Sequence, residues 1–129
     1  MAFKIDTREK FHVIKPDETN LSANMTAELE QHLAILLNTP VKNVILNVTG
    51  VVAMDINFAE FLVKKQQWYY EQQFSFVICC LEVVLEDWLD AEGLLEMMNV
   101  TPTESEAWDI VQMEEIEREF MSEEEDGKE

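Results

Sequence analysis

The chain has 129 residues, 47% of them hydrophobic, and a formal net charge of −18. This length provides the core of one compact domain and falls short of two well-packed domains. Because the charge repels phosphate groups and anionic headgroups, it argues against nucleic-acid binding and against electrostatic docking on a membrane. The N-terminal stretch MAFKIDTREKF is charged where a signal peptide is apolar, and no apolar run approaches the roughly 20 residues of a membrane span, so we expect a cytoplasmic protein.

The acidic side chains are concentrated in the C-terminal third of the chain. Residues 1–81 hold 9 acidic and 7 basic residues, a net charge of −2, whereas residues 82–129 hold 18 and 2, a net charge of −16. Solvated helix faces and a frayed end account for most of these charges, and the segment would also suit a protein partner with a basic face. We predict one domain over residues 1–121 and an acidic disordered tail over residues 122–129.

The first half of the chain predicts two short strands, a helix and a buried strand. FKID and FHVIK flank the charged connector TREK, which is typical of a hairpin at a sheet edge, closed by Pro16. A helix is predicted next, because apolar residues recur at helical spacing: Met25, Leu29, Leu33, Leu36 and Leu37. It is expected to end near Asn38, just before Pro40. The apolar run over residues 44–48 indicates a strand that is covered on both faces.

The second half predicts two further helices, a buried strand and a closing helix. Helices are expected over residues 58–72 and 83–98, the latter interrupted near Gly93, with the apolar strand FSFVICCLE between them. MNVTP is either a short strand or extended chain. Thr103 and Glu106 form a capping-box pattern at the start of the last helix, whose apolar stripe consists of Ile110, Met113, Ile116 and Phe120.

This alternation of strands and helices predicts an α/β domain. We expect a mixed, mostly parallel sheet of about four to five strands, flanked by about four helices. In such folds, ligands and partners usually meet the protein at the loops that follow the carboxyl ends of the strands. Residues 50–58 form one of these loops, so they are the first place to look for a functional surface.

Two stretches of the sequence resemble the STAS domain, a module of sulfate transporters and of bacterial anti-sigma factor antagonists. NVILNVTGVVAMDINFAEFLVKK is similar to that family's strand, its aspartate-leucine-serine-glycine type turn, and the aspartate-serine-serine-glycine turn that opens the next helix. LEVVLEDWLDAEGLLEMMNVTPTESEAWDIV resembles the family's third helix, short return strand and closing helix. The resemblance extends over residues 3–120 and implies a single STAS-like domain.

The resemblance implies a regulatory role. In the antagonists, the second serine of the aspartate-serine-serine-glycine turn is phosphorylated by a partner kinase that is also the anti-sigma factor, and the unphosphorylated form binds that partner. The turn corresponds here to Asp55, Ile56, Asn57 and Phe58, so Asn57 stands at the phosphoacceptor position without a hydroxyl. The resemblance therefore implies a non-catalytic interaction module that binds an anti-sigma factor or kinase-like regulator and is not phosphorylated at this position.

The same resemblance indicates which residues contact the partner. A family aspartate before the first helix corresponds to Asn20, and the aspartate before the turn glycine corresponds to Asn47. We expect a partner-binding surface at the start of the helix that follows the turn, made of Asn20, Asp55, Ile56, Asn57, Phe58, Phe61 and Lys64.

Purely structural roles compete for three of these residues. Asn57 precedes Glu60 by three residues and is predicted to cap the helix, either alone or together with a partner contact. Asp55 is predicted to accept hydrogen bonds from the backbone of its own turn. Phe58 is either the first core residue of the helix or a partly exposed aromatic anchor.

No pattern in the sequence points to catalysis, a metal or a cofactor. Neither His12 nor His32 has zinc-ligand spacing around it, and the glycines are isolated, so there is no phosphate-binding loop. Adjacent Cys79 and Cys80 are expected as buried free thiols on opposite faces of a strand. Three alternatives stay open: a structural or homodimeric scaffold subunit, a small-ligand-binding domain, and a switch in which Thr49 is phosphorylated instead.

Overall fold

The computed structural model describes residues 2–127, which form one α/β domain in which helices cover a central sheet. The predicted strand and helix order is confirmed, with two short strands added. In chain order the elements are β1 (Phe3–Thr7), β2 (Phe11–Pro16), β3 (Asn20–Leu21), α1 (Met25–Leu36), β4 (Asn43–Asn47), β5 (Ala53–Met54), α2 (Ile56–Glu71), β6 (Phe76–Cys79), α3 (Val83–Ala91), the 3₁₀ turn η1 (Leu95–Met97), β7 (Val100–Thr101) and α4 (Glu104–Gly127).

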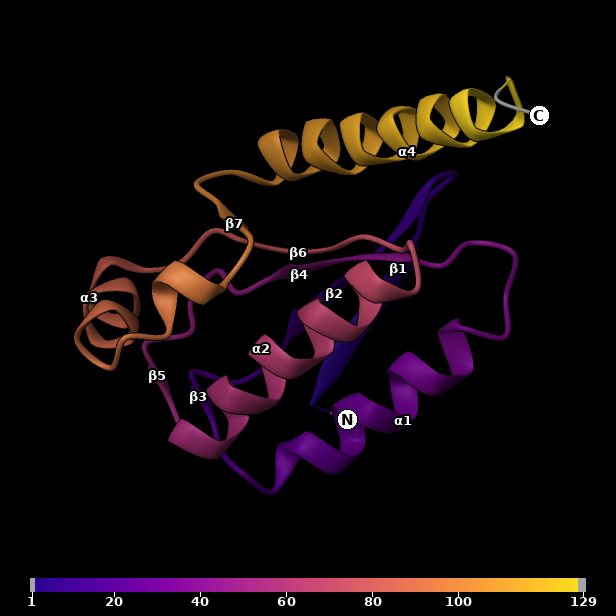
Figure 1. Cartoon of the computed structure of the whole chain (residues 1–129). Coiled ribbons are helices and arrows are strands. Elements are labelled where there is room, and N and C mark those ends of the chain that lie inside the picture. The colour runs from indigo at the N-terminus through magenta and orange to yellow at the C-terminus, as the bar shows by residue number, and fades with distance from the viewer. Residues whose placement is uncertain (1, 128–129) are drawn as a thin grey trace.

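The main sheet has five strands in the order β1-β2-β4-β6-β7 (Figure 1). Only β1 is antiparallel, because it forms a hairpin with β2, whereas β2, β4, β6 and β7 run parallel. The predicted fold class is therefore confirmed as a mixed, mostly parallel sheet with four α-helices in the described residues. The stretch MNVTP forms the short edge strand β7 rather than extended chain.

The two faces of this sheet are covered by different helices. Helices α1 and α2 lie together on one face and α4 lies alone on the other, while α3 sits at one end (Figure 1). Side chains alternate between the faces, as expected of strands covered on both sides. In β4, Val44 and Leu46 join the larger core under α1 and α2, whereas Ile45 joins the smaller core under α4.

The larger core explains why α1 and α2 form where the sequence predicts them. Their apolar stripes include Leu29, Leu33, Leu62 and Tyr69, which are all at most 1% exposed. Burial of an apolar side chain of this size contributes roughly 1.5–3 kcal/mol each, so these stripes fix both helices on the sheet. Burial also raises the pKa of the Tyr69 phenol, because the charged form would lose its hydration.

Helix α4 forms as predicted, although only Ile110 of its predicted apolar stripe packs against the sheet side, where it is half-buried. The predicted cap by Thr103 is confirmed, since the amide of Glu106 donates to Thr103 Oγ1 at 3.2 Å; the Glu106 carboxylate accepts from the Thr103 hydroxyl at 3.1 Å, whereas a capping box would have it accept from the Thr103 amide. Ala107 and Val111, both fully buried, form the face that packs on the sheet. The predicted stripe residues Met113, Ile116 and Phe120 are instead 54–64% exposed.

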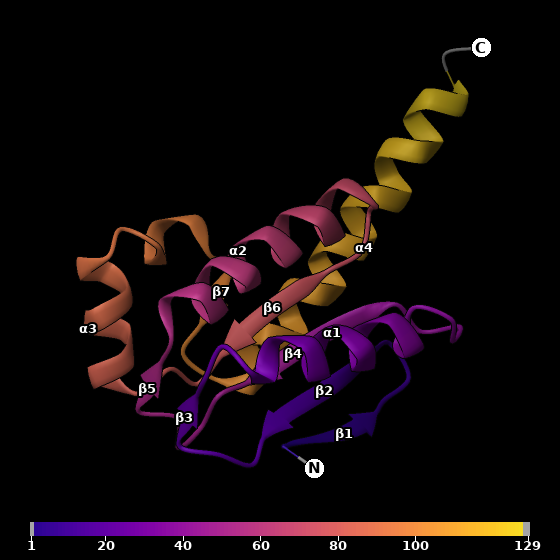
Figure 2. The same ribbon diagram turned by 90° about the horizontal axis from the view of Figure 1, so that it is seen from below.

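The C-terminal end of α4 extends beyond the edge of the sheet (Figure 2). The helix runs to Gly127, and residues 128–129 lie outside the described residues. The predicted domain limit at residue 121 and the predicted disordered tail over residues 122–129 stay predictions.

Helices α2 and α3 end in the same way with different residues. In both, the chain turns through a left-handed residue, Gln73 (φ 65°) after α2 and Gly93 (φ 74°) after α3. The amide two residues beyond the last helical cap donates back to the helix, from Phe74 to Tyr69 O at 2.8 Å and from Leu94 to Leu89 O at 3.0 Å. This pattern is a Schellman motif, and the interruption predicted at Gly93 is the end of α3.

Candidate interaction surface at the carboxyl edge of the sheet

Two short strands bring the loop before α1 next to the start of α2. Strands β3 and β5 pair in parallel, with Asn20 opposite Ala53 and Leu21 opposite Met54. The amide of Asp55 continues this pairing and donates to Leu21 O at 2.8 Å. The two segments that were predicted to share a surface, the Asn20 loop and the turn into α2, are therefore neighbours. Periodicity could not reveal strands of two residues each.

The cap of α2 is Asp55, and the prediction that Asn57 caps the helix is wrong. Asp55 has an extended backbone (φ −70°, ψ 143°), and its Oδ1 accepts from the amide of Asn57 at 2.8 Å. The helix therefore begins at Ile56, two residues earlier than expected from Phe58. The predicted hydrogen bond from the turn's backbone to Asp55 is confirmed, and the Asn57 side chain is left exposed in the first turn.

Phe58 is a core residue, which confirms the first of its two predicted roles, whereas the alternative role as a partly exposed anchor for a partner is wrong. Its side chain is 0% exposed within the larger core, and its ring lies 6.2 Å from that of half-buried Phe61. Starting the helix at Ile56 turns Phe58 inward and Ile56 outward, where Ile56 is 36% exposed. Phe58 therefore supports the surface from behind.

The exposed part of α2 continues this surface. Lys64 is exposed and lies two turns beyond Asn57 on the same side of the helix, since residues seven apart share a helical face. Lys65 is held differently, because its Nζ pairs with Glu30 Oε1 of α1 at 3.2 Å and lies 5.7 Å from the ring centre of Phe61. Of the two lysines, Lys64 is the one directed to solvent.

Sequence reasoning missed three exposed valines beside this turn. Val52 precedes β5, and Val83 and Val84 are the first residues of α3; they are 50%, 74% and 57% exposed. Val52 and Val84 also line a cavity of about 180 Å³, together with Met54 and Trp88. The pair of valines in LEVVLE was the available signal, because residues at the first turn of a helix often point to solvent rather than to the core.

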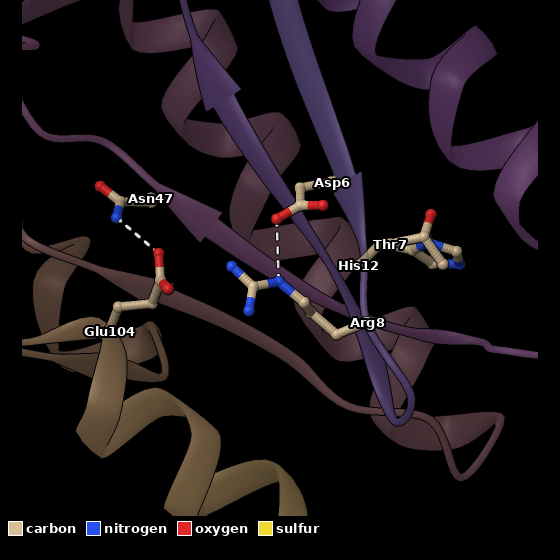
Figure 3. A network of polar contacts seen from close by, with 6 residues as sticks. All are labelled: Asp6, Thr7, Arg8, His12, Asn47 and Glu104. Atoms are coloured by element: carbon tan, nitrogen blue, oxygen red, sulfur yellow. Dashed lines mark hydrogen bonds and ion pairs between the residues drawn. The ribbon is translucent and has the colours of Figure 1, made fainter.

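The loop after β4 is held by side-chain hydrogen bonds. Asn47 Oδ1 accepts from the amide of Thr49 at 3.0 Å and from its hydroxyl at 2.6 Å. On its other side, Asn47 Nδ2 donates to Glu104 Oε1 at 2.9 Å and so joins β4 to the start of α4 (Figure 3). Gly50 takes a positive φ of 84°, and its amide donates to Glu82 Oε1 at 3.0 Å. This loop therefore presents a fixed edge.

The histidine on β2 has a structural role. His12 is 1% exposed, and its Nδ1 lies 2.8 Å from Thr7 Oγ1, on the opposite side of the hairpin from the Asp6–Arg8 ion pair (Figure 3). Its Nε2 lies 2.8 Å from Val41 O, which can only accept, so Nε2 carries a proton and donates it to this carbonyl. The ring thereby ties β1 to the segment before β4.

The two cysteines are free thiols, as expected, but they do not separate onto opposite faces. Cys79 is buried in the smaller core and Cys80 packs against the same core. The pleat is broken because Cys80 adopts a left-handed conformation, with φ 66°. Burial raises the pKa of the Cys79 thiol, which makes it a poor nucleophile at neutral pH.

Comparisons with known proteins agree with this architecture. The model of the STAS domain family matches residues 2–107. A putative anti-sigma factor antagonist from Thermotoga maritima is similar in structure, with a TM-score of 0.73 and 16% identity over 85% of this chain and 94% of that chain. An anti-sigma-factor antagonist (STAS) domain protein from Planctomyces limnophilus has a TM-score of 0.71 and 19% identity over 85% and 97% of the two chains.

A third similar structure is the anti-sigma factor antagonist SpoIIAA in its unphosphorylated form, with a TM-score of 0.67 and 17% identity over 86% of this chain and 96% of that one. At such identities the likeness concerns the fold. The search of curated proteins finds no match. Within the described chain, none of the helices combines the length and the apolar character that a bilayer crossing requires.

Proposed function

Because the chain belongs to the STAS domain family, we propose that it is a protein-interaction module of the anti-sigma factor antagonist type. STAS domains are usually non-catalytic regulatory modules, and likeness to anti-sigma factor antagonists implies protein partners in general. The proposed partner is an anti-sigma factor or a kinase-like regulator. It binds at the start of α2, and binding does not depend on phosphorylation there.

The observation that carries this proposal is a set of exposed apolar side chains, called the apolar patch, near the turn that corresponds by the family resemblance to the aspartate-serine-serine-glycine turn. Val52 and Val84 border one small cavity and are 50% and 57% exposed, and Ile56, which is 36% exposed, is the first residue of α2. Polar side chains lie at its margin, from Asn20 on β3 to Asn57 and Lys64 on α2. An apolar centre within a polar rim is the usual composition of a protein–protein interface.

We propose contacts for six of the seven predicted residues. Asn20, Ile56, Asn57 and Lys64 offer exposed side chains, and half-buried Phe61 and Asp55 contribute their accessible edges. Phe58 is withdrawn from the contact list because it is buried. Val52, Val83 and Val84 are added, since an apolar group of the partner can pack into the small cavity that Val52 and Val84 border.

Constitutive binding follows from the chemistry of Asn57. An amide has no hydroxyl to accept a phosphoryl group, so a kinase cannot place at this position the negative charge that would release the partner. In this proposal the position corresponding to the phosphoacceptor serine is occupied by a residue that keeps the surface permanently in its binding form.

A pull-down from lysate of the source cells, read by mass spectrometry, tests the interaction site. We compare wild type with Asn57→Lys, Val84→Ser, which changes the patch without touching the core. The matched control is Asn38→Lys, which adds the same charge to an exposed position after α1, away from the start of α2. A kinase-like or sigma-regulating protein that is retained by wild type and control, and lost by the patch variant, is expected.

If wild type, the patch variant and the control all recover such a partner, the partner does not bind at the proposed surface. Recovery of only the chain itself would favour a self-associating scaffold. Phosphorylation is tested with the recovered partner and ATP: the variant Asn57→Ser is expected to gain one phosphate, and wild type none. Phosphate incorporation into the wild-type chain, for example at exposed Thr49, would contradict constitutive binding.

A further inference from the structure

The outer face of α4 carries a row of large apolar side chains. Met113, Ile116 and Phe120 are spaced three and four residues apart, so they lie along one side of the helix. They are 54%, 64% and 64% exposed. Helix α4 lies alone on its side of the sheet, so no other element of the described chain covers this row (Figure 1). We call Met113, Ile116 and Phe120 the outer stripe.

The helix cannot rotate to bury the outer stripe, because its opposite side is anchored. Ala107 and Val111 are buried on the sheet. One turn further on, Ser75 Oγ donates to Glu114 Oε1 at 2.6 Å and accepts from Arg118 Nη2 at 3.2 Å. These contacts span three turns of α4 and hold the outer stripe toward solvent.

Acidic side chains border the outer stripe on both sides. Over residues 104–120 the helix has seven acidic residues and a single basic one, Arg118, which gives a net charge of −6. Successive helical residues are about 100° apart, which places Glu106 and Glu117 on one side of the stripe and Glu119 on the other. All three are exposed. The face is therefore an apolar row between two acidic rows.

A groove beside the outer stripe has the same character. It has a volume of about 350 Å³ and lies where the end of α2 meets α4, and its charged lining consists of Glu71, Glu114, Glu117 and Arg118, beside Tyr70. Tyr70 is 75% exposed. Three carboxylates against one guanidinium leave the groove net negative, so together with the aromatic ring they favour a cationic side chain, through its charge and through cation–π attraction.

We propose that the outer stripe of α4 binds an amphipathic helix of a partner protein, with an apolar seam flanked by Lys or Arg residues. The apolar row of the partner packs on Met113, Ile116 and Phe120, its basic flanks face the acidic rows, and one basic side chain enters the groove at Tyr70. A second copy of the chain is a poor occupant, since two acidic helices would face each other with like charges. This surface is separate from the proposed site at the start of α2, and neither requires the other.

The proposal is tested with two synthetic 21-residue peptides of one composition. In the first, leucines occupy heptad positions a and d and lysine or arginine flanks them; in the second, the leucines are spread around the helix. Fluorescence anisotropy with the full chain is measured near physiological salt, where long-range charge attraction is largely screened. Tighter binding of the first peptide is expected, and Ile116→Ser, Phe120→Ser should weaken it by about tenfold or more, a loss of roughly 1.4 kcal/mol.

The matched control is Val83→Ser, Val84→Ser, which removes equally exposed apolar surface at the start of α3 and should leave the affinity unchanged. Equal binding of both peptides, or no binding, would overturn the proposal, because charge alone or nothing would then account for the face. Sedimentation that shows a wild-type dimer dissociated by Ile116→Ser, Phe120→Ser would also overturn it, in favour of a second copy.

Discussion

The face of the sheet under α1 and α2 and the face under α4 use apolar residues in opposite ways. On the first, the stripe of α2 lies against the sheet, and Phe58, Leu62 and Tyr69 are fully buried. On the second, the small residue Ala107 and the medium-sized Val111 contact the sheet, while larger side chains such as Phe120 face solvent. Both helices are amphipathic at the same spacing, so spacing alone does not tell which side of a helix is covered.

The difference teaches that the first half of a helix can hold it on a sheet while large apolar side chains further along stay exposed. Helix α4 is attached by buried Ala107 and Val111, by half-buried Trp108 and Ile110, and by the Ser75–Glu114 hydrogen bond. We therefore expect packing of α2 to dominate the free energy of global unfolding, and we expect α4 to detach from the sheet at a smaller free-energy cost. Four substitution experiments break or sharpen this comparison.

The largest effect is expected for Phe58→Ala compared with Phe120→Ala. Phe58 is fully buried, so its truncation removes packing and leaves a cavity, which costs about 3–5 kcal/mol of unfolding free energy. Phe120 is 64% exposed, and the same change there should stay within about 0.5 kcal/mol. Urea unfolding followed by circular dichroism measures both. Equal losses would mean that α4 packs on the sheet through its outer stripe.

The next effect concerns how independently α4 is held. Val111→Ala removes two buried methyl groups from the smaller core, at a cost of about 2 kcal/mol. Hydrogen exchange is expected to show faster exchange for α4 amides and little change for α2 amides, because α4 can open locally. A uniform loss of protection in both helices would show that the two layers unfold as one unit.

A smaller effect is expected at the helix caps. Asp55→Ala removes the acceptor for the Asn57 amide at 2.8 Å and should cost about 1 kcal/mol, because α2 cannot fray without disturbing the larger core. Thr103→Ala removes the cap of α4, whose hydrogen bond from the Glu106 amide is longer at 3.2 Å, and should lower the unfolding free energy by less. Asp55→Asn, which retains a side-chain oxygen, is the control. A larger loss at Thr103 than at Asp55 would reverse the proposed order of the layers.

The smallest effect is a gain. Gln73 adopts at the end of α2 the left-handed conformation that Gly93 adopts after α3, and this conformation costs a non-glycine residue about 1–2 kcal/mol. Part of that gain is offset by the greater freedom of glycine in the unfolded chain, so Gln73→Gly should stabilise by about 0.5–1 kcal/mol. In calorimetry, the Tm of the Gln73→Gly variant is expected to rise by a few degrees, and the Tm of the Gly93→Ala variant is expected to fall. A fall for Gln73→Gly would show that the Gln73 side chain itself stabilises the turn.

The sequence predicted the fold well where burial on two sides leaves a continuous apolar run. Strands β4 and β6 are of this kind, and they were placed within a few residues; helix α2 was placed equally well by its one-sided apolar stripe. Strands β3 and β5 escaped prediction because a two-residue strand has no periodicity. The outer stripe of α4 was recognised as apolar, but its exposure follows from which side of α4 packs on the sheet, the side of Ala107 and Val111, and this is a tertiary choice that spacing does not show.

The candidate surface was predicted in outline and corrected in detail. The proximity of Asn20 to the α2 turn follows from the resemblance to the STAS family, and the structure has both at one edge. The cap was misassigned because Asp55 and Asn57 are both good capping residues. The choice between them rests on the amide of Asp55, which pairs with Leu21 O and holds Asp55 extended. That tertiary contact then turns Phe58 inward.

The short pairing of β3 with β5 has a consequence for how recognition can diverge. Its hydrogen bonds join main-chain atoms only, as in the donation from the amides of Val52 and Asp55 to Thr19 O and Leu21 O, both at 2.8 Å. The exposed side chains on this edge, such as those of Asn20 and Ala53, can therefore be exchanged without moving the backbone that displays them. A module built in this way can acquire new partners by point substitution, while its scaffold and the order of its surface persist.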